Sequence, residues 1–164
     1  MHSNKSKGLM KCLAIASLGL SLGLSTGASH AAGEKFVMVS HAPDSDSWWN
    51  TIKNAIKQAG EDFNVSVDYR NPPNGDLADM ARLIEQSAAR NYDGLIADIA
   101  DFSVLQKPLG TVVAKKIMLV TINSGTLAQS EQLKAIMHVG QPEYDAGLGA
   151  GKRAKEAGIK SFVC

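Results

Sequence analysis

Polar and aromatic side chains gather in four short segments, each of which directly follows an apolar run. The segments are 41–49, 98–101, 123–125 and 140–141. Their side chains carry the donors, acceptors and flat apolar faces that bind a small neutral ligand. The candidate ligand contacts are Asp46, Trp48, Trp49, Asp98, Asp101, Asn123, Ser124 and Gln141.

The two tryptophans of the chain are adjacent, at positions 48 and 49. An indole face stacks well on the apolar C–H face of a sugar ring. Trp49 continues a helical stripe through Ile52 and Ile56, which makes core packing and ligand stacking equally open for it. Trp48 lies one position off that stripe, and we expect it to stack on a ligand.

Four polar residues are candidate hydrogen-bonding contacts. Asp46 can cap the helix that follows it, and it can also accept from a ligand hydroxyl. Asp98 ends an apolar strand, where an ionised carboxylate could accept from two hydroxyls of a polyol. Asp101 is typical of a cap for the next helix. Asn123 offers both a donor and an acceptor at another strand end.

Catalytic and metal-binding patterns are missing from the sequence. Asp98 and Asp101 have no nucleophile or base spaced to work with them, and no set of Cys, His and carboxylate residues has metal-ligand spacing. His138 lies within a predicted strand, where we expect it to be buried and hydrogen-bonded. The segment GLGAGKR at 147–153 fails the phosphate-loop pattern, because Ala146 and Arg153 occupy required Gly and Ser/Thr positions. We therefore expect no enzyme activity and no cofactor.

Strand and helix patterns alternate along the chain, which predicts an α/β fold with a parallel sheet and helices on both faces. The weakest helix is 101–116, because Pro108 would kink it or restart it. In parallel sheets ligands bind beyond the carboxyl ends of the strands. The predicted strands are 36–40, 65–69, 94–97, 117–122 and 135–139, and the predicted helices are 47–62, 77–90, 101–116 and 143–157.

The first 31 residues have the pattern of a secretory signal peptide. Lys5, Lys7 and Lys11 precede an apolar run that is short for a membrane span, and small residues then lead to a cleavage site after Ala31 or Ala32. Cleavage of this segment would remove three lysines and no acidic residue, so the formal net charge would change from +1 to a negative value. Because the mature chain carries no excess of positive charge, we expect it to have no nucleic-acid partner. We expect the exported chain to be located in a bacterial periplasm.

Four segments together resemble the type I periplasmic sugar-binding proteins, the ribose and simple-sugar class that serves ABC importers. These segments are DSDSWW, DGLIADIADFSVL, VTINSG and VGQPEYDAG, and the resemblance runs from about residue 35 to 164. It implies that Asp46 and Asn123 contact a sugar and that Trp48 and Trp49 stack on it. Ser124 stands where some relatives have Arg, and Asp98 where Asn is common.

The resemblance also implies a two-lobed fold that closes on a simple sugar or polyol. Residues 32–139 would form the N-terminal lobe, and residues 140–164 the hinge crossing and the start of an incomplete second lobe. The final residues, from Ser161 to Cys164, are expected to open a strand that the chain leaves unfinished. The implied partners are the sugar and the membrane permease of an ABC importer, or a chemoreceptor, and the full-length protein would be a monomer.

Two other functions fit the α/β pattern. The effector domain of a sugar-responsive transcription repressor shares the expected fold, but it would need a helix-turn-helix where residues 1–31 show a signal peptide. An exported α/β enzyme could use Asp46 or Asp98, but it lacks an assembled catalytic set.

Overall fold

The computed structural model describes residues 33–140, 142–161 and 163. The predicted signal peptide and the predicted site residue Gln141 lie outside the described residues. Ser161 and Val163 have no regular structure, and the rest of the strand predicted from Ser161 lies among residues that are not described.

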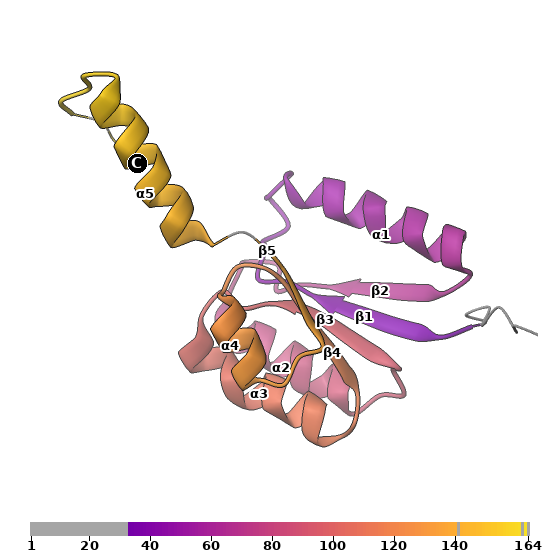
Figure 1. The fold of residues 1–164 in the computed structure, drawn as a ribbon. Helices are drawn as coiled ribbons and strands as arrows, with labels where there is room; N and C mark the ends of the chain where they lie inside the picture. Colours follow the sequence, from indigo (N-terminus) through magenta and orange to yellow (C-terminus); the bar gives the residue numbers. More distant parts are fainter. Residues whose placement is uncertain (1–32, 141, 162, 164) are drawn as a thin grey trace, which may run out of the picture.

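Five parallel strands form one sheet, in the order β2-β1-β3-β4-β5. Each strand is followed by a helix, so the predicted α/β fold with a parallel sheet is confirmed (Figure 1). The strands are β1 Lys35–Val39, β2 Ser66–Arg70, β3 Gly94–Asp98, β4 Met118–Asn123 and β5 Met137–Gly140. The helices are α1 Trp49–Phe63, α2 Leu77–Ala88, α3 Phe102–Ala114, α4 Leu127–Gln132 and α5 Glu143–Glu156.

Helices cover both faces of the sheet, as predicted, and each face has its own core. Helix α1 lies on one face, α2 and α3 lie on the other, and α5 extends away from the sheet (Figure 1). Residues such as Met80, Leu95 and Leu109 build the larger core beneath α2 and α3. Met38, Ala42 and Trp49 build the smaller core beneath α1. Side chains alternate across a strand, so neighbouring residues of β1 and β3 serve opposite cores.

The helix boundaries follow local chemistry. Asp76 caps α2 by accepting from the Asp79 backbone N–H at 2.8 Å. Helix α3 continues through Pro108 instead of restarting there, and Pro108 is buried within it, as are Leu105 and Leu109. Helix α4 was not predicted, although Thr126 and Gln129 form a capping box at its start.

Gly125 lies just after β4 in a conformation that only glycine adopts easily, with φ of +99°. A Cβ atom at this position would lie 2.7 Å from the Cβ atom of buried Ile99. Gly125→Ala should therefore lower the free energy of unfolding by on the order of 1 kcal/mol, through overpacking and backbone strain.

Urea unfolding of Gly125→Ala and Gly110→Ala separates this effect from the general effect of replacing glycine. Gly110 lies inside α3, and a Cβ atom there meets nothing within 4 Å. We expect Gly110→Ala to be neutral or to stabilise by about 0.5–1 kcal/mol. Equal unfolding midpoints for Gly125→Ala and the unmodified protein would show that the turn accepts a side chain.

Candidate functional site

The candidate site lies between β1 and β3, where the order in which successive strands join the sheet changes direction. Strands β1 and β3 are neighbours, but β1 continues through α1 to β2, whereas β3 continues through α3 to β4. Helices α1 and α3 lie on opposite faces of the sheet, so the segments that follow β1 and β3 diverge (Figure 1). Such a switch point at the carboxyl ends of parallel strands is where open α/β sheets bind ligands.

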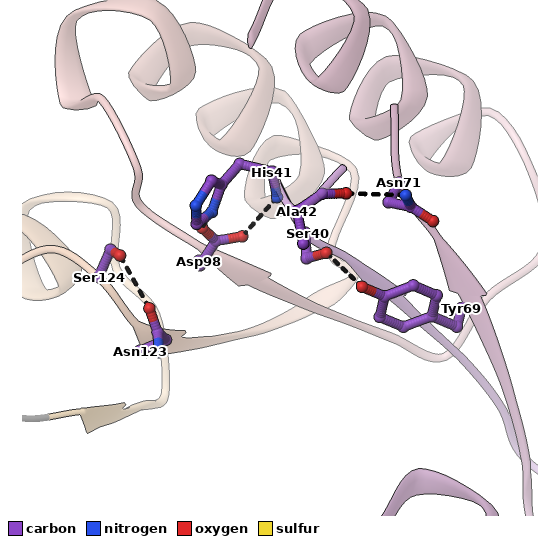
Figure 2. A network of polar contacts seen from close by, with 8 residues as sticks. All are labelled: Ser40, His41, Ala42, Tyr69, Asn71, Asp98, Asn123 and Ser124. Carbon is purple, nitrogen blue, oxygen red and sulfur yellow. Dashed lines mark hydrogen bonds and ion pairs between the residues drawn. The ribbon is translucent and has the colours of Figure 1, made fainter. Parts of the chain in front are cut away.

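The loop after β1 is fastened to the end of β2. The Ser40 and Tyr69 hydroxyls share a hydrogen bond of 2.6 Å, and burial raises the pKa of Tyr69. The Asn71 side-chain amide donates to the Ala42 carbonyl at 2.8 Å (Figure 2). These contacts hold the backbone on both sides of His41, and they fix where its side chain leaves the sheet.

Asp98, the last residue of β3, is fully buried with 0% exposure. Its Oδ1 accepts from the His41 backbone N–H at 3.1 Å, and its Oδ2 pairs with the His41 ring nitrogen Nδ1 (Figure 2). The hydrogen bond that the His41 ring makes to Asp98 raises the pKa of His41, while partial burial opposes that shift. The carboxylate predicted to face a polyol therefore faces a histidine in this structure.

The twin tryptophans differ sharply in exposure. Trp49 is 3% exposed and packs with Met38 and Ala42, which makes it a core residue. Trp48 is 54% exposed, and its ring meets the Trp49 ring edge to face at a centroid distance of 5.3 Å. The helical stripe correctly separated the two side chains, and Trp48 is the one available for stacking.

Asp46 and Asp101 both bond to backbone groups that begin a helix. Asp46 Oδ1 accepts from the Trp48 backbone N–H at 3.0 Å, just before α1. Asp101 caps α3, accepting from the backbone N–H groups of Ser103 at 2.8 Å and Val104 at 3.3 Å. The hydrogen bond from the Ser103 hydroxyl is the main reason that the pKa of Asp101 is lowered. A ligand contact of either carboxylate stays a prediction.

Asn123 and Ser124 form the polar end of β4. Asn123 has a left-handed backbone with φ of +57°, which asparagine tolerates better than most residues. Its Oδ1 accepts from the Ser124 hydroxyl at 2.8 Å, so its side-chain NH₂ group is left to bind a ligand (Figure 2).

A cleft of about 570 Å³ lies beside these strand ends. It brings together two of the predicted contacts, Trp48 and Asn123, and adds Glu143 from the first turn of α5. Glu143 was not predicted as a contact, although it is an early polar residue after a strand. His41 was not predicted as a contact either, and it is not one of the residues that line the cleft. The lining residues are Trp48, Ile52, Ile122, Asn123, Val139, Gly140 and Glu143.

Within the described ranges, no group of three or more His, Cys, Asp or Glu side chains is placed to hold a metal ion. The same part of the chain contains no helix that is long and apolar enough to cross a membrane. The cleft itself is lined by an indole, an amide, a carboxylate and apolar side chains, a mixture that suits a polar molecule with apolar faces.

A family model for the periplasmic binding protein domain matches residues 36–161. The chain belongs to this family. The match covers all of the sheet except its first residue, Lys35, and every described helix, so the family resemblance seen in the sequence is confirmed. No match was found among curated proteins.

Solved structures of the family include carbohydrate-binding members. A carbohydrate transporter from Acidothermus cellulolyticus 11B, solved with myo-inositol, is 31% identical with a TM-score of 0.73, over 78% of this chain and 44% of that one. AraP, an arabinose-binding protein from Geobacillus stearothermophilus, is 28% identical with a TM-score of 0.61, over 76% and 42%. A sugar-binding protein of a Bacillus halodurans sugar ABC transporter is 25% identical with a TM-score of 0.64, over 75% and 41%.

The chain spans less than half the length of these three solved proteins. It is thus homologous to one part of the sugar-binding proteins of ABC transporters. The domain boundaries expected at residues 139 and 140 stay predictions. In this structure β5 ends at Gly140, and α5 begins at Glu143.

Proposed function

We propose that the full-length protein is the periplasmic solute-binding subunit of an ABC importer and that it binds a simple sugar or polyol between two lobes. The observation that carries this proposal is the cleft at the carboxyl edge of the sheet in a periplasmic binding protein domain. Exposed Trp48 offers an apolar ring face there, and Asn123 offers hydrogen bonds, which together suit a ring that bears hydroxyls.

The proposed role is binding without chemical conversion. Asp98 is paired with His41, and Asp101 caps α3, so neither carboxylate is free to act as an acid or base opposite the other. The membrane permease of the importer is the proposed partner that receives the ligand. The relatives' sugars, myo-inositol and arabinose, are the natural first probes.

The proposal is tested by releasing the full-length protein from cells by osmotic shock and titrating it in a calorimeter. We expect recovery in the periplasmic fraction and one-to-one binding of at least one probe among myo-inositol, arabinose, glucose and galactose. The bound sugar should be recovered chemically unchanged. L-Leucine serves as the control ligand, because it has no ring for Trp48 to stack on.

A protein that stays in the cytoplasm would contradict the proposed location. A protein that binds leucine but none of the four sugars would contradict the proposed ligand class. A sugar that returns from the incubation altered would favour the exported enzyme instead.

A further inference from the structure

At the switch point between β1 and β3, the His41 side chain is partly exposed to solvent, whereas the Asp98 side chain is not. Asp98 is fully buried, and both of its carboxylate oxygens contact His41. The His41 side chain keeps 34% of its surface exposed. Its ring meets the buried Trp49 ring edge to face at 5.8 Å, which fixes the plane of the imidazole beside the tryptophan pair.

We propose that His41, oriented by Asp98, donates a hydrogen bond from Nε2 to an oxygen of a neutral polyhydroxyl ligand. This inference rests on the proposed function and names a contact and a ligand class within it. Asp98 then acts as a positioning residue through His41. Among the described residues, Nε2 of His41 has no protein hydrogen-bond partner, which leaves this atom free for a ligand.

The contact with the Asp98 carboxylate determines whether Nε2 of His41 is a hydrogen-bond donor or acceptor. It accepts the proton of Nδ1, so a neutral His41 ring carries its one proton on Nδ1 and leaves Nε2 as a bare acceptor. A second proton must sit on Nε2 and turn it into a donor. Because Asp98 favours the charged ring, His41 keeps this donor to a higher pH than an unpaired histidine would.

The charges around His41 favour a neutral ligand over an acidic one. Asp98 from β3, Asp46 from the loop before α1 and Glu143 from α5 are all close enough to raise the pKa of His41. Three carboxylates therefore act on one imidazolium, and Asp98 is the one in contact with it. A sugar acid would add a fourth negative charge, and its repulsion from these groups would oppose binding.

The test is calorimetric titration of the full-length protein and its variants with myo-inositol, glucose and arabinose, and with galacturonate as the acidic probe. His41→Ala should weaken binding of the preferred neutral sugar by about tenfold or more, since a hydrogen bond to a charged group is lost. His41→Gln retains a neutral donor, and it should bind more tightly than His41→Ala. Galacturonate should bind more weakly than the neutral sugar.

A pH series separates a ligand contact from a structural role. Affinity of the unmodified protein should be highest at low pH and should fall as pH rises through the pKa of His41. His41→Gln should remove this dependence, and Asp98→Asn should move the fall to lower pH. His138→Gln is the matched control, because the His138 ring bonds the hydroxyl of buried Thr121 at 2.8 Å, and it should keep the original profile.

The inference is overturned if His41→Ala binds the sugar as well as the unmodified protein does, or if the unmodified protein binds equally well across the pH series. Galacturonate binding more tightly than every neutral sugar would overturn the ligand class. In each case the proposed function survives, because a sugar is still bound. Failure of every sugar to bind would overturn the proposed function and this inference together.

Discussion

Trp49→Ala should lower the free energy of unfolding by about 3–5 kcal/mol, the usual cost of removing a large aromatic side chain from a core. Trp49 is 3% exposed and forms the smaller core with Met38 and Ala42 beneath α1. That core has few buried members, so neighbouring side chains cannot easily collapse into the space that an indole leaves. The edge-to-face contact with His41 would be lost as well.

Urea unfolding followed by circular dichroism measures this effect. Trp48→Ala is the matched control, because it removes the same side chain from the adjacent, exposed position and should change the free energy of unfolding little. Trp49→Ala unfolding at the same urea concentration as Trp48→Ala would show that the smaller core does not depend on this ring.

Trp48→Ala should instead weaken sugar binding by about thirtyfold, or about 2 kcal/mol, the scale of a dominant aromatic contact in an interface. Trp48 lines the 570 Å³ cleft beside Asn123, and 54% of its surface is exposed for a ligand to cover. The buried Trp49 ring supports it from behind at 5.3 Å, which limits the freedom that Trp48 must lose on binding.

Calorimetric titration of the full-length protein with its preferred sugar measures this loss. Phe63→Ala is the control, because Phe63 is an exposed aromatic residue at the opposite end of α1, 67% exposed and outside the cleft lining. Phe63→Ala should leave the affinity unchanged. If Trp48→Ala also binds the sugar with unchanged affinity, the ligand does not stack on this ring.

Hydrophobic periodicity was enough to predict the fold, because each strand and helix carries its own pattern. The stripe through Trp49, Ile52 and Ile56 correctly predicted which face of α1 turns inward. Helix α4 escaped prediction because it has six residues and only Ser130 of them is buried. Pro108 was expected to kink or restart the helix, because proline removes a backbone hydrogen bond, but α3 runs from Phe102 to Ala114 without restarting.

The candidate site was harder to predict because its chemistry depends on contacts between distant residues. His41 and Asp98 are 57 residues apart, and no local pattern shows that the carboxylate is occupied by the histidine. The parallel pairing of β1 with β3 brings them together. Asn123 was easier to predict, since a polar residue that ends an apolar strand is informative without knowledge of its neighbours.

The edge-to-face pair of indoles also has an optical consequence. Rings whose centroids lie 5.3 Å apart exchange excitation energy and couple their electronic transitions, so emission and near-ultraviolet dichroism will report the pair instead of either residue. The His41 ring touches the same pair through Trp49, and a protonated imidazole quenches indole emission. The protein therefore carries a built-in fluorescent reporter of the charge on His41, readable without any attached dye.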